Sequence, residues 1–569
     1  MDTDTTQYPE IMKKKTKIIL LALAIPLSAF IYMGAGDPYF EISKNLDIFA
    51  SLYRELNTNY VDETKPGELM KTGIEAMLAS LDPYTNYIAE SDIEDYRFMT
   101  TGQYGGIGAL IQKRGDDVII TETYDDFPAQ MNGLLIGDRI VTIDGKDVTG
   151  KKTDEISEFL KGQAGTEVSI KVLRGTDKDV NTLNFKLKRA EIKIHDVPFY
   201  SMIREDVGYI RLTGFTQTAS SEFAAALRKL KENEGLKSLI VDLRGNGGGL
   251  LRESVAIVNF FVDRGTPVVY TKGKLREWDQ EYKALNAPID RDIPLVVLVN
   301  ENSASASEIV SGSLQDLDRA VIIGRETYGK GLVQQTVDLS YNSKLKVTVA
   351  KYYTPSGRCI QKINYADRDA EGKPLEIPDS LIREFKSIKY ERPLYDGKGI
   401  KPDIAVPENL LHNITRGLYQ DYHIFDFATK YRLEHKEVPG PEDFHASDEL
   451  MARFSDYVNS REFSYSTSAE KYLEKLREST VEEHYYKDVE SEYDLLKKKL
   501  LEVKNKDFEK HKEEIREVLS HEIIQRYYHQ KGQLEYSLKY DPYVDSALAV
   551  LGDPGRYEAI LKGGPQSTK

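Results

Sequence analysis

The chain has 569 residues, of which 40% are hydrophobic and 30% are charged, and its formal net charge at pH 7 is −15. A chain of this length is too long for one hydrophobic core, so we expect about three or four domains. The strong negative charge argues against nucleic acid as a partner, because phosphate groups require a basic surface.

The N-terminal 36 residues have the pattern of an export signal. A lysine-rich flank, residues 13–17, precedes the apolar stretch "IILLALAIPLSAFIYMGAG", residues 18–36. This stretch is close to the length of about 20 residues that spans a bilayer, and its small residues at 34–36 would permit cleavage, so a signal peptide and a membrane anchor both remain open. The lysines should stay in the cytoplasm. We therefore expect a periplasmic or other extracytoplasmic protein, with membrane contact, and an inner-membrane anchor if the segment is retained.

The rest of the chain divides by its apolar spacing. Residues 37–101 have helical spacing, whereas residues 102–190 form short alternating strands. In residues 191–406 strands alternate with helices, which predicts an α/β layer structure. Residues 364–395 within it are charged and aperiodic, which indicates an insertion or a long loop. Residues 407–569 are rich in lysine and glutamate with helical spacing, typical of solvated helices. The expected fold class is a multidomain α+β protein.

A small peptide-binding module is predicted within residues 102–190. The stretch "GLLIGDRIVTIDGKDV" holds an Asp144-Gly145 hairpin turn between alternating apolar residues. Upstream, a glycine-rich loop precedes the strand "ALIQ", and consecutive amides in such a loop can hold a terminal carboxylate. The loop consists of Gly105, Gly106, Ile107 and Gly108. With the helix "TDEISEFLKG", these features resemble a PDZ domain of the bacterial protease type, in which a small barrel-like sheet is packed with helices.

Several common catalytic patterns are absent from the sequence. There is no G-x-S-x-G, no G-x-G-x-x-G and no Walker motif, and His521-Glu522 lacks the second histidine of a zinc-protease helix. Only His195 lies in the first 400 residues, which disfavours a Ser-His-Asp triad in the α/β region. Cys359 is the only cysteine, so neither an intramolecular disulfide nor a cysteine-based metal site can form.

The stretch "ENSASASEIVSGSLQD", residues 301–316, presents three alternating serines directly after an apolar run. Ser305 and Glu308 have the spacing of a capping box, in which each side chain satisfies the other's free amide. From this stretch alone, the serines could either cap a helix or supply a catalytic nucleophile.

A serine nucleophile without histidine requires another base, and a lysine can serve if it is kept neutral. The candidate is Lys330 in "GRETYGKGLVQQTVDL", although a lysine between glycines is also typical of a turn or an anion-binding loop. Gln334 lies four residues later, on the same side of a strand, and can orient an amine without adding charge.

A third candidate segment, after those of Ser305 and Lys330, is "SLIVDLRGNGGGL", residues 238–250. In it a predicted buried strand ends in a glycine-rich loop. Amides of Gly247 and Gly248 can point at a developing oxyanion, and a helix that begins at Ala306 would offer another amide. Glycines after a strand can also be purely structural.

Residues 40–406 resemble the carboxyl-terminal processing proteases, also called tail-specific proteases, of the S41 Ser-Lys peptidase family. The resemblance rests on "LDPYTNYI", the PDZ segment, "DLRGNGGGL", "NENSASASE", "GRETYGKGLVQ", "YYTPSGRCIQ" and "GIKPDIAV". It implies a crotonase/ClpP-like protease core in residues 191–406, and a serine endopeptidase that needs no metal or cofactor. It further implies protein or peptide substrates with accessible C-termini, and leaves homo-oligomerisation open.

The same resemblance assigns roles to residues of this chain. Ser305 would be the nucleophile, Lys330 the general base and Gln334 the residue that orients the base. The oxyanion amides would come from Ala306 and the Gly247-Gly248 stretch. This sequence has glycine where the family often has proline, which leaves open which loop amide donates.

Two other functions remain to be distinguished from the protease. One is a catalytically silent scaffold whose PDZ domain only captures C-termini, although all three catalytic residues are present. The other is a hydratase or isomerase on the related crotonase fold, which is suggested by the glycine loop but lacks any acyl-coenzyme A signature. Cleavage of an unfolded protein with an apolar C-terminus would separate the three.

Overall fold

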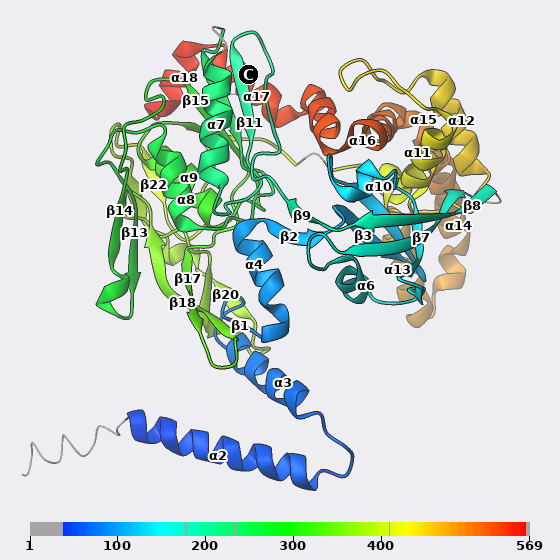
Figure 1. The fold of residues 1–569 in the computed structure, drawn as a ribbon. Coiled ribbons are helices and arrows are strands. Elements are labelled where there is room, and N and C mark those ends of the chain that lie inside the picture. The colour runs from blue at the N-terminus through cyan, green and yellow to red at the C-terminus, as the bar shows by residue number, and fades with distance from the viewer. Residues whose placement is uncertain (1–37, 177–178, 233–234, 409, 565–569) are drawn as a thin grey trace, which may run out of the picture. The chain divides into compact units, whose positions relative to one another are not determined.

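The computed structural model describes residues 38–176, 179–232, 235–408 and 410–564 (Figure 1). The predicted export segment, residues 18–36, lies outside the described residues. The chain divides into two compact units, Met1–Pro83 and Tyr84–Lys569. Across the described ranges, no helix is both long enough and apolar enough to cross a membrane.

A six-stranded sheet forms the centre of the α/β region. The strand order is β10 (Phe199–Met202), β11 (Val207–Arg211), β12 (Ser238–Asp242), β15 (Leu295–Val299), β16 (Val321–Gly324) and β23 (Ile404–Ala405). All neighbours are parallel except β10, which pairs antiparallel with β11. Every residue of β12 and β15 is buried, as expected for parallel strands that are covered on both faces.

Two layers of helices cover this sheet (Figure 1). The front layer consists of α7 (Ala219–Lys231), α8 (Leu251–Asn259) and α9 (Ala306–Asp316), and the back layer of α17 (Pro542–Leu551) and α18 (Pro554–Leu561). Successive strand residues point to opposite faces, so Val297 packs with the front layer, whereas Val296 packs with the back layer. Residues assigned from the sequence to a C-terminal helical region thus include one cover of the α/β sheet.

The α/β region also contributes to a second sheet, which is antiparallel. It runs β1 (Asn86–Ile88), β18 (Lys344–Tyr353), β13 (Pro267–Gly273) and β14 (Gln280–Lys283), and β17 (Leu332–Asp338) also pairs with β18. The segment 364–395 is largely two hairpins rather than an irregular loop. These are β19 (Ile363–Arg368) with β20 (Pro374–Glu376), and β21 (Glu384–Lys386) with β22 (Pro393–Tyr395). Most of these strands have only three residues, which is too short for an alternating pattern to be recognised.

The predicted PDZ segment forms a sheet with two short helices. The strand order is β3 (Ala109–Arg114), β4 (Asp117–Thr123), β5 (Arg139–Ile143), β7 (Glu167–Thr176) and β8 (Asp179–Lys188), with β6 (Lys146–Asp147) on β5. The helices are α5 (Pro128–Met131) and α6 (Thr153–Leu160). Asp144 and Gly145 join β5 to β6 with positive φ angles of 50° and 76°, as the Asp-Gly turn predicted. Helix α4 (Ile93–Thr101) and strand β2 (Gln103–Gly106) precede this sheet in the chain. Strand β9 (Ala190–Lys193) follows it and pairs with β2.

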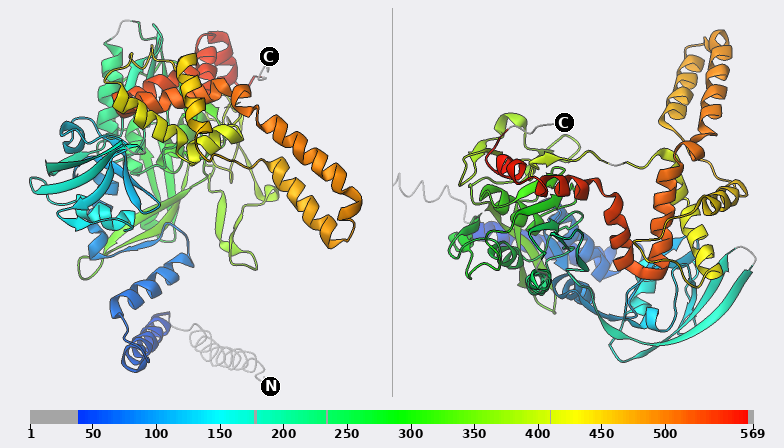
Figure 2. Two further views of the ribbon diagram at one scale, coloured as in Figure 1. Left: turned by 90° about the vertical axis from the view of Figure 1, so that its right-hand side faces the viewer. Right: turned by 90° about the horizontal axis from the view of Figure 1, so that it is seen from above.

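The C-terminal region is helical, as expected, and has a hydrophobic core of its own. Its helices before the back layer are α10 (Asn413–Gln420), α11 (His423–Glu434), α12 (Asp448–Asn459), α13 (Ser468–Glu482), α14 (Tyr486–Lys504), α15 (Asp507–Lys510) and α16 (Lys512–Ser537). Buried residues of α10, α11, α12 and α16 form the core. Helices α13 and α14 form the hairpin drawn in orange in Figure 2. Helix α16 is kinked at His529, whose φ of 51° is not helical.

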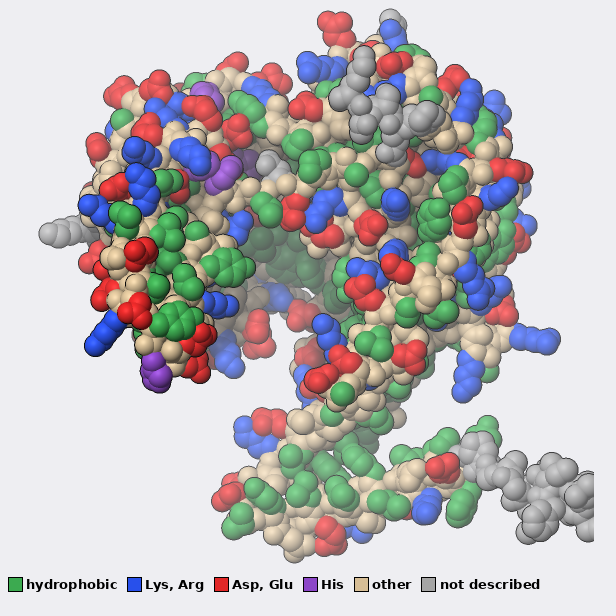
Figure 3. All heavy atoms as spheres, turned by 180° about the vertical axis from the view of Figure 1, so that it is seen from behind, with side chains coloured by type: hydrophobic (Ala, Val, Ile, Leu, Met, Phe, Trp, Pro, Cys, Tyr) green, Lys and Arg blue, Asp and Glu red, His purple; other side chains and the backbone are tan. Residues whose placement is uncertain are grey.

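The described part of the first unit consists of two helices, α2 (Pro38–Asn59) and α3 (Pro66–Ala79). Helix α3 begins with proline, whose missing N–H costs nothing at a helix start. Figure 3 shows hydrophobic side chains along α2, and its large apolar residues, such as Phe40 and Leu46, are exposed.

Candidate active site

One cavity of about 440 Å³ is lined by all six residues predicted to carry the chemistry. They are Ser305, Lys330, Gln334, Ala306, Gly247 and Gly248. The glycines follow β12, the serine follows β15 and the lysine follows β16. Loops at the carboxyl ends of neighbouring parallel strands meet at one edge of a sheet, which brings these distant segments together.

Ser305 occupies the position directly before α9 with an unusual backbone, φ 55° and ψ −112°. A positive φ is uncommon for a residue with a side chain and indicates local strain of the kind found at functional sites. The Ser305 hydroxyl makes no cap hydrogen bond, whereas the Glu308 carboxylate accepts from the Ser305 N–H at 2.8 Å. The glutamate half of the predicted capping box is therefore formed.

The two neighbouring serines have structural contacts instead. Ser303 Oγ donates to the carbonyl of Leu243 at 2.9 Å, and Ser307 Oγ donates to the carbonyl of Asn246 at 2.8 Å. Both side chains are fully buried. These contacts attach the first turn of α9 and the segment before it to the loop of residues 243–249, here called the glycine loop. Of the three serines, only Ser305 lines the cavity.

The glycine loop approaches the serine so closely that a side chain would not fit. A Cβ atom on Gly248, whose φ is 96°, would lie 2.8 Å from the Cβ of Ser305. The Gly248 N–H donates to Asn246 Oδ1 at 2.9 Å. Among the described residues, the amides of Gly247 and Ala306 donate to no acceptor. In this conformation both amides are available to an oxyanion.

Glu308 joins the serine segment to the lysine segment, a role that its capping-box position did not reveal. Its buried carboxylate accepts from Thr327 Oγ1 at 2.6 Å, from the Gly329 N–H at 2.7 Å and from the Lys330 N–H at 2.9 Å. It also accepts from the Ser305 N–H. Burial raises the pKa of Glu308, and these hydrogen bonds oppose the rise.

Lys330 and Gln334 lie on the second sheet's side of the cavity. The Lys330 Nζ is 4.0 Å from the ring centroid of Tyr84, a contact that sequence analysis did not anticipate. Burial raises the pKa of Tyr84 well above its ordinary value. Gln334 Nε2 donates to Thr348 Oγ1 on β18 at 3.2 Å, which fixes its amide. Lys346 also lines the cavity, and burial lowers its pKa.

The four predicted carboxylate-binding residues fall into two pairs. Gly105 and Gly106 belong to β2 and pair with β9. Ile107 and Gly108 follow, and within the described part of the chain their amides donate to no acceptor. They lead directly into β3, which is at an edge of its sheet. Two amides therefore adjoin an open strand edge.

Comparison with protein families gives three matches along the chain. Residues 206–369 match the model of peptidase family S41, residues 105–187 match a PDZ domain, and residues 414–551 match the C-terminal helical domain of a probable PDZ-protease. The last match lies outside residues 40–406, the part of the chain on which the resemblance in the sequence rests.

One solved structure and two curated proteins are among those similar to this chain. A solved photosystem II D1 C-terminal processing protease is 29% identical, with 64% of this chain and 93% of that chain covered and a TM-score of 0.34. A probable CtpA-like serine protease of Staphylococcus aureus strain COL is 35% identical over 60% of this chain and 68% of its own length. The carboxy-terminal-processing protease of Bartonella bacilliformis is 35% identical over 336 residues, which are 58% of this chain and 76% of that protein. This chain therefore belongs to the carboxyl-terminal processing proteases, serine-type peptidases of family S41 with a PDZ domain.

Proposed function

We propose that this protein is an endopeptidase that uses a Ser305–Lys330 dyad to cleave exported proteins at or near their C-termini. The observation that carries the proposal is the common cavity, which is lined by Ser305, by Lys330 and by two residues whose amides are unengaged. A candidate nucleophile and a candidate base in the lining of one cavity form the arrangement that nucleophilic catalysis requires.

The reaction follows from this arrangement. Ser305 Oγ attacks the scissile carbonyl carbon and passes its proton to the neutral amine of Lys330. The amides of Ala306 and Gly247 stabilise the resulting oxyanion, aided by the positive end of α9. The C–N bond then breaks as Lys330 returns the proton to the leaving amine. Water, deprotonated by Lys330, releases the acyl group from Ser305.

Gln334 has a supporting role in this scheme. Its amide, held by Thr348, orients the lysine amine without placing a negative charge beside it. A carboxylate at this position would favour the ammonium form and remove the base.

The PDZ domain is proposed to capture the substrate's C-terminus. The amides of Ile107 and Gly108 would hold the terminal carboxylate, and the peptide would extend the sheet along the open edge of β3. The N-terminal segment, residues 18–36, supports a location outside the cytoplasmic membrane with contact to that membrane. Exported proteins are therefore the proposed substrate class.

Catalysis is tested with an unfolded protein that has an apolar C-terminus. We expect the wild type to produce fragments by mass spectrometry, and Ser305→Ala to lose at least about 10³-fold in kcat/KM with unchanged folding and peptide binding. Peptide binding without any cleavage by the wild type would instead identify a scaffold. Turnover by Ser305→Ala would exclude this nucleophile.

Capture is tested separately with two peptides that differ only at the C-terminus. A free acid should bind about tenfold more tightly than the corresponding amide, because amidation removes the charge that the loop recognises. Fluorescence anisotropy with the Ser305→Ala protein measures both dissociation constants without cleavage. Equal affinities would exclude this capture mode and leave the proposed protease chemistry unaffected.

A further inference from the structure

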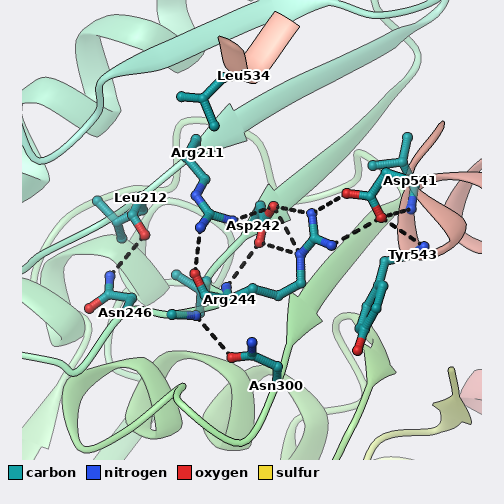
Figure 4. A network of polar contacts seen from close by, with 12 residues as sticks. Arg211, Leu212, Asp242, Arg244, Asn246, Asn300, Leu534, Asp541 and Tyr543 are labelled. Atoms are coloured by element: carbon teal, nitrogen blue, oxygen red, sulfur yellow. Dashed lines mark hydrogen bonds and ion pairs between the residues drawn. The ribbon is translucent and has the colours of Figure 1, made fainter. Parts of the chain in front are cut away.

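A charged cluster connects the glycine loop to the sheet beneath it (Figure 4). Asp242 ends β12 and is fully buried, and it accepts hydrogen bonds from the Tyr209 hydroxyl at 2.6 Å and from the Arg244 guanidinium. Arg211 forms a further ion pair with it at 2.6 Å. Burial opposes ionisation of Asp242, but the two guanidinium groups together hold its pKa below the usual range. Asp242 is thus an anionic anchor for the loop residue Arg244.

Arg244 is also held from the opposite side, by the back layer. Its Nη1 and Nη2 donate to the two carboxylate oxygens of Asp541 at 3.0 and 2.5 Å, although the residues are 297 positions apart. Its guanidinium carbon lies 4.7 Å from the ring centroid of Tyr543. Two-pronged pairs of this kind fix orientation as well as distance. In Figure 4, Asp541 and Tyr543 reach Arg244 from the side facing away from Asp242.

The backbone on both sides of this contact is fixed as well. Arg211 Nη2 donates to the Arg244 carbonyl at 2.6 Å, and the Gly245 N–H donates to Asn300 Oδ1 at 2.9 Å. Asn246 Nδ2 donates to the Leu212 carbonyl at 2.9 Å. The next amide is that of Gly247, which lacks an acceptor among the described residues. The peptide unit that carries this amide is held at its Asn246 carbonyl by the Ala304 N–H at 3.0 Å and the Ser307 hydroxyl at 2.8 Å. Its direction depends on these bonds and on how firmly residues 244–246 are held.

We propose that Asp541 is a positioning residue for catalysis, which holds Arg244 and thereby the Gly247 amide in the direction that an oxyanion requires. The C-terminal helix α17 would then act on the reaction without touching the substrate. The inference rests on the proposed peptidase function. An oxyanion donor acts mainly in the transition state, so loosening it should lower kcat and leave substrate binding nearly unchanged.

The chain contains a matched pair of residues for testing this role. Asp541 caps α17 by accepting from the Tyr543 N–H at 2.9 Å, and Asp553 caps α18 by accepting from the Arg556 N–H at 3.0 Å. Both precede a proline, but only Asp541 contacts Arg244. Asparagine caps helices as well as aspartate does, so Asp541→Asn and Asp553→Asn each remove a charge and retain a cap.

We expect Asp541→Asn to lower kcat about tenfold, a smaller loss than deleting an oxyanion donor causes. Its KM should stay within about twofold of the wild-type value. Asp553→Asn should change neither. A peptide aldehyde, whose adduct with Ser305 places an oxygen in the oxyanion site, should bind Asp541→Asn more weakly by the same factor. An unreactive peptide should bind both variants equally. Thermal unfolding of each variant determines whether a lower folded fraction accounts for any loss, which would overturn the proposal.

A double-mutant cycle tests whether Asp541 acts through Arg244. Arg244→Lys keeps a charge for Asp242 but loses the two-pronged contact, so adding Asp541→Asn to it should cost little more. Additive losses in kcat would overturn the role. If the wild type cleaves and Asp541→Asn has the same kcat, only the proposed role of Asp541 is contradicted. A wild-type protein that does not cleave would contradict the proposed function itself.

Discussion

The two helical layers of the central sheet differ in origin and in what they contribute. Front-layer helices α8 and α9 each follow the strand that they cover, after loops that carry the glycines and the serine. The back layer comes from residues 542–561, far along the chain. Ligand sites form where such loops leave the carboxyl ends of strands, so the loops before the front layer carry the candidate nucleophile and the candidate oxyanion amides. The back layer supplies buried apolar side chains, and Asp541 directly before it supplies a carboxylate. Substitutions in the two layers should therefore differ in how far they lower activity and how far they lower stability.

Lys330→Arg should have the largest effect among the substitutions that sharpen this division. Arginine retains the positive charge but cannot release its proton, so the base is lost and kcat/KM should fall by about 10²- to 10⁴-fold. Wild-type activity should rise with pH, because only the neutral amine accepts a proton. Steady-state rates across a pH series measure both effects. Near wild-type activity in the arginine variant would remove Lys330 from the mechanism.

Glu308→Gln should affect both activity and stability. The amide NH₂ of glutamine would face N–H or O–H groups that now donate to a carboxylate oxygen, leaving two of them unsatisfied. We expect a free energy of unfolding lower by about 2–4 kcal/mol and a kcat lower by about tenfold. Denaturant unfolding and kinetics on the folded fraction separate the two. If kcat stays unchanged while stability falls, Glu308 is only a structural link.

Ser303→Ala and Ser307→Ala should cost stability more than activity. Each removes one buried hydrogen bond to the glycine loop, at about 1–2 kcal/mol, and leaves the cavity lining intact. Both variants should keep measurable cleavage in the assay that Ser305→Ala fails. The opposite outcome, with Ser305→Ala active and one of these variants inactive, would assign the nucleophile to another serine.

The smallest effect on activity is expected from Tyr557→Phe in the back layer. The Tyr557 hydroxyl accepts from the Leu295 N–H at 2.9 Å and donates to the Leu295 carbonyl at 3.2 Å. Its loss leaves buried backbone groups unpaired, which should lower the free energy of unfolding by about 1–2 kcal/mol with kcat unchanged. Calorimetry and kinetics at one temperature measure both. A reduced kcat in fully folded protein would break the division between the layers.

The sequence predicted more of the front layer than of the back layer. Ser305, Lys330 and Gln334 could be grouped because each lies on a segment that follows a recognisable strand. Helical spacing at residues 544, 547 and 550 indicates an apolar face but not the surface on which it packs. Only the fold reveals that surface.

Side-chain contacts of the candidate site were also beyond the sequence. The bonds of Glu308 to Thr327 and Gly329 join segments that are about twenty residues apart, and capping-box spacing already accounted for the glutamate. The engagement of the Gly248 amide depends on where the Asn246 side chain points, which no spacing rule specifies. Such contacts depend on tertiary packing.

The distant origin of the back layer has a consequence for how the protein is made. Strand β12 leaves the ribosome about 300 residues before Asp541. One apolar face of the sheet therefore stays exposed until the back layer has been synthesised. During that interval the nascent chain has the loops of the candidate active site but not the Asp541 carboxylate that contacts Arg244. A ribosome that stopped before residue 541 would release a chain with an open sheet, a substrate for quality control rather than a working protease.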